Sequence, residues 1–277
     1  MKDPRPSPIA GTWYPRDIDT LTQSIDEQLE AAEVKLPPGE VIGIVAPHAG
    51  HRYSGFVAAH AFRCLQGLAP DLVIMLSPLH EAYLGELFTS AHDAYSTPLG
   101  NIPIYVEGID QLRDVLRGQV NIKRIRNDQE HAIEIELPFL QRVLRKPFLL
   151  LPIMLREQSQ EVAQTLGIAL AEMLKGQKAV LVASSDLSHF HPAELAKQLD
   201  QQMLSQIEAF DPAGVLKADQ RGHGYACGRG AIAAALWAAQ GLGANQVNVL
   251  AYAHSGTVTG DHQSVVGYGS AVIFRDN

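Results

Sequence analysis

The chain has 277 residues, which is enough to bury a large hydrophobic core. It carries 22 basic and 30 acidic residues, and this formal net charge of −8 disfavours nucleic acid as a partner. The N-terminal stretch has no apolar region typical of a signal peptide, and no apolar run is long enough to span a bilayer, so we expect a cytoplasmic protein without a membrane partner. Two cysteines exclude a disulfide framework, which fits a reducing compartment.

Short aliphatic runs alternate with longer segments of helical periodicity, which is typical of an α/β protein. In chain order, the pattern predicts a strand over 41–47, a helix over 55–65, a strand over 71–78, an irregular or hairpin segment over 82–106, helices over 109–116 and 131–144, a strand over 148–155, a helix over 160–174, a strand over 179–186, helices over 193–209 and 229–240, and strands over 247–255 and 265–274. Pro138 is expected to bend or shorten the helix that contains it.

Several predicted strands are apolar at nearly every position, which favours strands covered on both faces. The sequence shows no internal repeat and no linker rich in Pro, Gly or Ser. We therefore expect one α/β domain over 1–277, with a central mixed, largely parallel sheet flanked by helices.

Three of the predicted strands run into a histidine. His48 follows the strand at 41–47, His80 follows the strand at 71–78, and His189 follows the strand at 179–186. In open α/β sheets, ligands bind beyond the carboxyl ends of the strands, where loops project side chains from a rigid base. If the strands are parallel neighbours, the three imidazoles meet in one crevice.

Neutral imidazole is a common ligand of zinc, iron and copper, and an open metal site needs a further ligand. The best candidate is Cys227, in the stretch GHGYACGRG, where glycines allow close approach and a helix is predicted to follow. A helix N-terminus lowers the pKa of a thiol, so this position favours a thiolate. The alternative is a small residue buried at a helix contact.

Asp186 and His189 lie three residues apart in the stretch SSDLSHF. On a helical turn this spacing places both side chains on one side, where the carboxylate orients the imidazole for general acid–base catalysis. The alternative is that Asp186 or Ser185 caps a turn and His189 lies on the surface.

The blocks AGTWYP, APHAGHRYSG, SPLH, EHAIEIELPFL, SSDLSHF, CGRG and GDHQSVVGYGSAVIF occur in this order between residues 9 and 274. Together they resemble the Memo family, the mediator of ErbB-driven cell motility and its relatives, whose bacterial members are labelled AmmeMemoRadiSam system protein B. The resemblance implies a fold similar to the catalytic subunit of class III extradiol ring-cleaving dioxygenases. It also implies an iron or copper site formed by His48, His80 and Cys227.

The resemblance further implies that Asp186 and His189 are acid–base neighbours of the metal, and that Trp13 and Tyr53 line the pocket and contact its ligand. The dioxygenases complete their iron site with a glutamate, whereas the matching position here is Cys227. A thiolate shifts the metal preference toward copper or changes the redox behaviour of iron, so ring cleavage is not implied.

Three further histidines each have two alternative roles. His51 is expected to line the pocket as a ligand-binding residue or to fix the loop by a hydrogen bond. His131, together with Glu130 and Glu134, could imitate a metal motif, although a capped helix start is the simpler interpretation. His254 ends a strand and is expected to be structural, or else a fourth donor.

These features predict a non-haem metal-dependent oxidoreductase that uses Fe(II) or copper, without an organic cofactor, on a small molecule or peptide. Two alternatives stay open: the same pocket could bind a phosphorylated or carboxylated peptide without catalysis, or the protein could store or deliver metal. The family's association with a radical-SAM protein implies a possible pathway partner, and a homodimer is the default expectation.

Overall fold

Four parallel strands form the centre of the sheet. In spatial order these are β2 (Glu40–Ala46), β9 (Ala179–Ser184), β3 (Leu72–Pro78) and β8 (Leu149–Leu155). The computed structural model describes residues 3–276. Every residue of β3 is buried, and burial on both faces explains why these strands are apolar at successive positions.

Both sides of the parallel centre end in antiparallel pairs, so the nine-stranded sheet is mixed, as the sequence predicts. On one side β12 (Val265–Arg275) pairs antiparallel with β2, and both β11 (Gln246–His254) and β10 (His189–His191) pair with β12. On the other side β4 (Leu87–Ser90) pairs antiparallel with β8, and β7 (Ile122–Ile125) follows β4. All six predicted strands are present.

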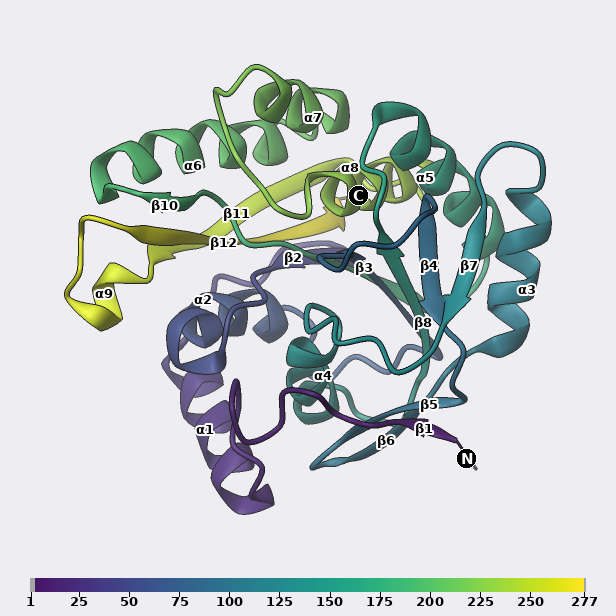
Figure 1. The fold of residues 1–277 in the computed structure, drawn as a ribbon, viewed down its shortest axis with the longest axis horizontal. Helices are drawn as coiled ribbons and strands as arrows, with labels where there is room; N and C mark the ends of the chain where they lie inside the picture. The colour runs from purple at the N-terminus through teal and green to yellow at the C-terminus, as the bar shows by residue number, and fades with distance from the viewer. Residues whose placement is uncertain (1–2, 277) are drawn as a thin grey trace.

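A separate three-stranded sheet holds the N-terminal segment. It consists of β1 (Pro4–Arg5), β5 (Ala94–Thr97) and β6 (Gly100–Pro103). β5 and β6 form a hairpin within the segment for which a hairpin or irregular structure was expected. β1 joins this hairpin in parallel, and the chain then continues to α1 at Ile18–Ala31 (Figure 1).

Helices cover both faces of the main sheet. Figure 1 shows α1 (Ile18–Ala31), α2 (His51–Arg63) and α4 (Leu137–Val143) below it, and α5 (Gln160–Leu174), α6 (Ala193–Glu208), α7 (Pro212–Gln220) and α8 (Arg229–Gly241) above it. The remaining helical segments are α3 (Val106–Val115), α9 (Gly256–Thr259) and the 3-10 turn η1 (Glu134–Glu136). The sequence prediction missed α1 and α7.

The predicted helix over 131–144 begins later than expected. His131 precedes the helical region, which starts with η1 and continues into α4. Pro138 lies at the start of α4, where its missing N–H removes no helical hydrogen bond. Of the two predicted effects of Pro138, bending or shortening, the helix is therefore shortened. His131 lies in an irregular segment before it.

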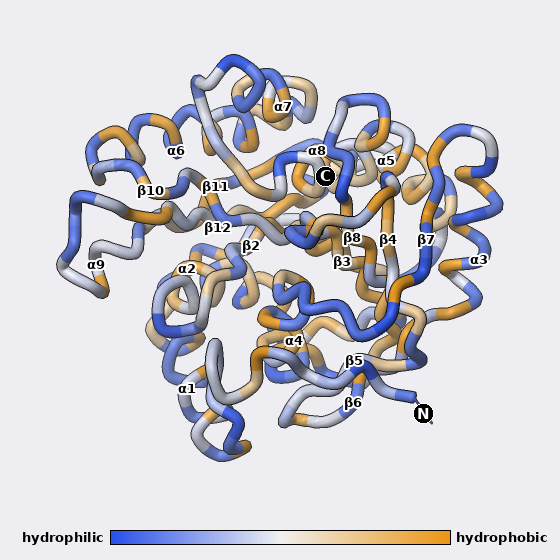
Figure 2. The backbone as a smooth tube through the Cα atoms, in the orientation of Figure 1, coloured by the Kyte–Doolittle hydropathy of each residue, from blue (hydrophilic) through white to orange (hydrophobic). Residues whose placement is uncertain are grey.

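The buried apolar side chains form one continuous core between the sheet and its two helical layers. Figure 2 shows hydrophobic positions concentrated on β3 and β8, whereas hydrophobic and hydrophilic positions alternate along the surrounding helices. Among the described residues, no helix combines the length and the apolar character that crossing a membrane requires. The core rigidly supports the strand ends from which the candidate site is built.

Candidate functional site

Two histidines and a cysteine meet at the carboxyl ends of the parallel strands. His48 follows β2, His80 follows β3, and Cys227 lies just before α8. One ligand atom from each lies within 4.8 Å of the others, and Cys227 Sγ is 3.2 Å from His48 Nε2. The predicted convergence of these three side chains is therefore present in the structure.

Ser184 fixes the orientation of the His48 ring. The Ser184 hydroxyl donates to the carbonyl of Ala132 at 3.0 Å, so its oxygen accepts from His48 Nδ1 at 2.9 Å. His48 therefore carries its hydrogen on Nδ1, and the lone pair of Nε2 points toward Cys227. Burial lowers the pKa of His48 well below its ordinary value, and the nearby His131, His80 and His189 lower it further, which keeps the ring neutral.

Glu130 performs the same task for His80. Its carboxylate accepts from His80 Nδ1 at 2.9 and 3.0 Å and from the His80 backbone N–H at 2.5 Å. Burial raises the pKa of Glu130, but these hydrogen bonds and the charge of His80 outweigh it and hold the pKa at about 2. The ionised carboxylate engages Nδ1 and leaves Nε2 of His80 as the ring nitrogen available to a metal. Burial lowers the pKa of His80, but the hydrogen bond to Glu130 and its charge outweigh burial and raise the pKa, so a metal would displace a proton from Nε2 of the charged ring.

Cys227 lies before α8, as predicted, but its surroundings do not favour a free thiolate. Burial raises the pKa of the thiol, and the carboxyl of Asp186 raises it further. The expectation of a lowered pKa is wrong for the metal-free chain, because burial outweighs the helix N-terminus. The thiol instead has hydrogen-bond partners at His48 Nε2, 3.2 Å away, and the carbonyl oxygen of Asp186, 3.5 Å away.

Gly228 allows the start of α8 to approach β9 closely. A Cβ at this position would lie 2.4 Å from the Ser184 carbonyl oxygen and 2.9 Å from the Ser185 Cβ. We expect Gly228→Ala to lower the free energy of unfolding by about 1–3 kcal/mol, because backbone must move to admit the methyl group. Urea denaturation would measure the loss, and an unchanged midpoint would contradict the close contact.

Asp186 does not orient His189. The segment between β9 and β10 is irregular, not the helical turn that we expected, and within the described chain neither side chain hydrogen-bonds to the other. Asp186 Oδ1 accepts from the backbone N–H groups of His48 at 2.8 Å and Ala49 at 3.3 Å. Burial raises the pKa of Asp186 to about 7 despite these bonds. Its carboxyl therefore holds the loop that carries His48.

His189 has a different fixed orientation. Its Nδ1–H donates to the carbonyl of Leu187 at 2.9 Å, so Nε2 carries the lone pair. Burial lowers the pKa of His189, and the proximity of His80 lowers it further. Within the described residues His189 belongs to neither donor group, so the predicted meeting of three imidazoles holds only for His48 and His80. Its neutral ring with a free Nε2 is suited to accept a proton.

His131 is a member of the cluster that the sequence interpretation undervalued. Its ring lies 4.8 Å from that of His80, 5.4 Å from that of His48 and 4.2 Å from that of Trp13, measured between centroids. Burial lowers the pKa of His131 to about 4. His80, Glu130 and His131 also form a second group of donors within 4.8 Å of one another.

The two aromatic residues expected at the pocket are both partly exposed. Trp13 and Tyr53 are 38% and 39% exposed, and Trp13 contacts the cluster through His131. Phe190 and Tyr225 are further exposed aromatic residues, next to His189 and two residues before Cys227. Phe190 also has a positive φ of 61°, which is rare for a bulky side chain. The sequence analysis did not select these two residues.

His51 is not placed to contact a ligand, which corrects one of its two predicted roles. It is 4% exposed, and its Nε2–H donates to the carbonyl of Ile135 at 2.8 Å. Its ring packs against Tyr14 and Phe139. The structure agrees with the alternative role, in which His51 fixes the loop by a hydrogen bond.

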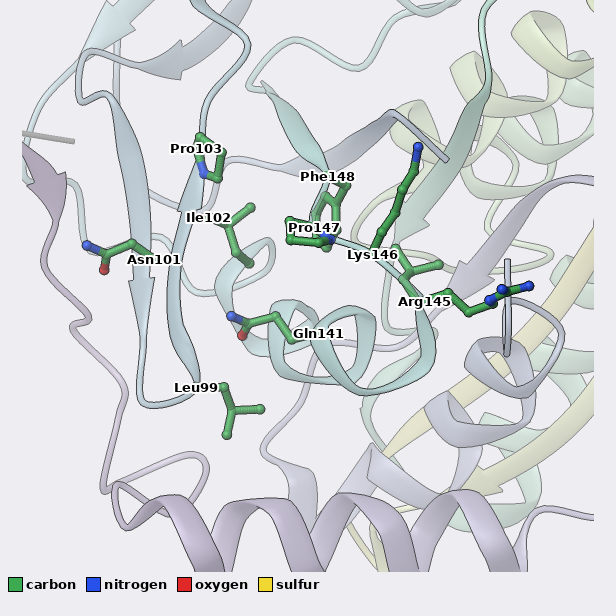
Figure 3. Close-up of a pocket in the computed structure, with 10 residues that line it drawn as sticks. Leu99, Asn101, Ile102, Pro103, Gln141, Arg145, Lys146, Pro147 and Phe148 are labelled. Carbon is green, nitrogen blue, oxygen red and sulfur yellow. The ribbon is translucent and has the colours of Figure 1, made fainter. Parts of the chain in front are cut away.

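His254 ends β11 and lies outside the two donor groups found among the described residues. Its nearest aromatic neighbour is His262, at 5.5 Å between ring centroids. A surface pocket lined by Leu99, Gln141, Pro147 and Phe148 lies beside α4 and β6 (Figure 3). It contains no member of the histidine–cysteine cluster, and we assign it no role in the site.

The fold and site define an α/β protein with a histidine–cysteine donor cluster beyond the parallel strands of its sheet. The family model described as Memo-like protein matches residues 5–272. A MEMO1 family protein of Methanosarcina mazei is 36% identical over 267 residues, covering 96% of this chain and 97% of that protein. A MEMO1 family protein of Nitrosopumilus maritimus is 32% identical over 269 residues, covering 95% and 96%. The chain therefore belongs to the Memo-like family.

Proposed function

We propose that the protein binds an iron or copper ion through His48, His80 and Cys227 and acts as an oxidoreductase. The observation that carries this proposal is the engagement of both Nδ1 atoms, by Ser184 and by Glu130, which leaves Nε2 of each ring available to a metal held beside the thiol. When a metal binds nitrogen at about 2.0–2.1 Å and sulfur at about 2.3 Å, with an angle of about 90–110° between the two bonds, the nitrogen and sulfur atoms lie roughly 3.1–3.6 Å apart. The observed 3.2 Å between Cys227 Sγ and His48 Nε2 fits this range.

The donor set suits a redox-active metal. Imidazole binds iron and copper, and a thiolate favours copper among the softer ions. A bound ion of either kind would supply one-electron redox chemistry and open coordination positions. Because the buried thiol has a raised pKa, metal would have to displace its proton.

The residues around the proposed metal site are assigned two roles, proton transfer and contact with the bound small molecule or peptide. His189 is the proposed general base, since Nδ1 is engaged by the Leu187 carbonyl and Nε2 is left free. Asp186 supports the site by holding the loop of His48. Trp13 and Tyr53 are the proposed contacts of a small molecule or peptide, because both are partly exposed and Trp13 contacts the cluster. A common fold with class III extradiol dioxygenases is part of the proposal.

Binding of a phosphorylated or carboxylated peptide is the weaker alternative. Such an anion would need free backbone N–H groups at the starts of α2 and α8. Several are already engaged: His48 and Ala49 donate to Asp186, Gly228 donates to Ser185 Oγ, and Gly230 donates to Gln158. The side chain of Arg229 contacts Asp219 at 3.1 Å. Acceptors within the protein thus already engage these backbone N–H groups and the side chain of Arg229, which leaves fewer donors for an anion.

Metal analysis tests the proposal. The protein should be purified without a histidine tag, loaded anaerobically with Fe(II) or with copper, and freed of excess metal. We expect about one ion per chain and oxygen consumption with a suitable reductant or substrate. Bound metal without oxygen consumption would favour storage or delivery, and absence of bound metal would refute the proposal. A radical-SAM partner, a homodimer and a cytoplasmic location stay predictions.

Glu130→Gln provides a second test. The amide keeps the volume but lacks the negative charge that engages His80 Nδ1, so we expect metal affinity to fall about 10–100-fold, as is usual for residues that orient a ligand. A competition titration with a chromogenic chelator would measure it. Glu107→Gln on the exposed surface of α3 is the control. Equal affinity in both variants would show that Glu130 does not support the site.

A further inference from the structure

The start of α8, directly after Cys227, is held by side chains from distant parts of the chain. The first N–H groups of a helix have no partner within the helix, and the N-cap residue Gly228 has no side chain that could accept from them. Ser185 Oγ accepts from the Gly228 N–H at 2.8 Å, and Gln158 Oε1 accepts from the Gly230 N–H at 2.8 Å. Ser185 follows β9 and Gln158 follows β8, so the ends of two central strands supply the cap.

Gln158 also contacts the backbone of Cys227. Its Nε2–H donates to the Cys227 carbonyl at 2.9 Å, while the Cys227 N–H donates to the Asp186 carbonyl at 3.2 Å. Both polar backbone groups of Cys227 are therefore engaged. A cysteine side chain has one torsion between its backbone and its sulfur, so a fixed backbone leaves only a few staggered positions for Sγ.

Gln158 is itself held in place. It lies in the short connection between β8 and α5, where the Glu157 N–H donates to the Glu86 carbonyl at 3.1 Å and Ser159 caps the start of α5. A Cβ at Gly230 would lie 2.9 Å from Gln158 Cβ and 3.0 Å from its Cγ, so glycine permits the two segments to lie this close. The amide meets both partners in one orientation only, because its oxygen must face an N–H group and its nitrogen must face a carbonyl.

We propose that Gln158 is a positioning residue, which holds the loop of Cys227 and thereby directs the thiol toward His48 and His80. Cys227 Sγ lies 3.2 Å from His48 Nε2, and the donor atoms of a metal site must be held within about 0.5 Å of their productive geometry. A loop that is free to shift further would not keep the sulfur in place. The consequence for metal affinity rests on the proposed function, whereas the consequence for the position of the thiol does not.

The rate of Cys227 alkylation by iodoacetamide, followed by mass spectrometry, tests the inference in metal-free protein. Gln158→Glu keeps the acceptor for Gly230 but loses the donor to the Cys227 carbonyl, and Gln158→Ala loses both. We expect Cys227 to react about three- to tenfold faster in both variants, which corresponds to the loss of one ordinary hydrogen bond.

Two controls separate this local effect from general loss of structure. Cys64 in the same sample should keep its wild-type rate, and so should Cys227 in Gln201→Glu, a matched change on the exposed surface of α6. An unchanged Cys227 rate in both Gln158 variants would overturn the inference. Equal acceleration of Cys64 would overturn it as well, because the effect would then be global.

Cobalt(II) titration supplies the second readout. We expect about tenfold weaker binding and a shifted thiolate-to-cobalt band in Gln158→Glu, with Gln201→Glu within about twofold of the wild type. If the wild type binds cobalt and Gln158→Glu has the same affinity and the same band, the inference is refuted. If the wild type binds no cobalt while the alkylation rates differ as expected, the proposed function fails and this inference stands.

Discussion

Replacement of Arg5 by methionine is expected to lower the free energy of unfolding by about 3–5 kcal/mol, because it leaves buried carboxylates without a cation. The Arg5 guanidinium contacts Asp128 and Glu134, each at 2.7 Å, and the side chains of all three residues are at most 1% exposed. It also donates to the Glu130 carbonyl at 2.6 Å. Arg5→Lys should recover little stability, since an ammonium group cannot reproduce the fork of donors.

Denaturation in urea, monitored by circular dichroism, would measure this loss. Arg126→Met is the matched control, because Arg126 contacts Asp3 at the surface, where the two side chains are 51% and 42% exposed, and we expect it to change stability little. Adding Asp128→Asn and Glu134→Gln to Arg5→Met should restore part of the loss by removing the unpaired charges. A melting transition of Arg5→Met equal to that of the wild type would contradict the buried ion-pair interpretation.

The same network connects the N-terminal segment to the site. Glu134 Oε1 accepts from the hydroxyls of Ser7, at 2.5 Å, and Tyr14, at 2.8 Å, so the segment before α1 is held at two further points. Trp13 lies in this segment and contacts His131. Loss of Arg5 should therefore also weaken the contact between Trp13 and His131, and a change in the fluorescence of Trp13 would report it.

The sheet could be predicted because its chemistry is local. The central strands covered on both faces are recognisable as apolar runs, and all six predicted strands are present, whereas the short β7 and β10 were not predicted. The prediction missed α1, although Leu21, Ile25 and Leu29 recur at helical spacing and Asp17 caps its start. It also missed α7, which has a similar start at Asp211 and Pro212.

The site was only partly predictable from the sequence. The proposed histidine ligands directly follow predicted strands, whereas the residues that hydrogen-bond to these histidines lie far away in the sequence. His48 and His80 are marked by their positions after apolar runs. Glu130 contacts His80 from 50 residues away, and Ser184 contacts His48 from 136 residues away, so spacing gave no sign of either contact. Asp186 was assigned to His189 because the two residues are close in sequence. In the structure its carboxylate instead accepts hydrogen bonds from two backbone N–H groups of the distant loop that carries His48.

Cys227→Ala is expected to abolish stoichiometric metal binding, whereas Cys64→Ala is not. Cys227 supplies the only sulfur of the proposed ligand set, and its loss would leave two imidazoles and lower the affinity by at least about 100-fold, more than the loss of an orienting residue. Cys64 is the control because it is the other free cysteine; it is buried, whereas Cys227 is partly buried. The Cys64 thiol is directed to the His60 carbonyl at 3.7 Å, and burial raises its pKa to about 12.

The comparison separates coordination from general thiol chemistry. Copper or cobalt bound to a thiolate gives a charge-transfer band that Cys227→Ala should lose and Cys64→Ala should keep. His48→Ala should lower the metal content as strongly as Cys227→Ala, because each removes one of the two donors that face each other at 3.2 Å. If both variants kept the metal content of the wild type, the ion would have to be held elsewhere, and the nearest remaining donors are His80, Glu130 and His131. In that outcome Glu130→Gln, not Cys227→Ala, would remove the metal, so the two ligand sets can be distinguished by the same measurement.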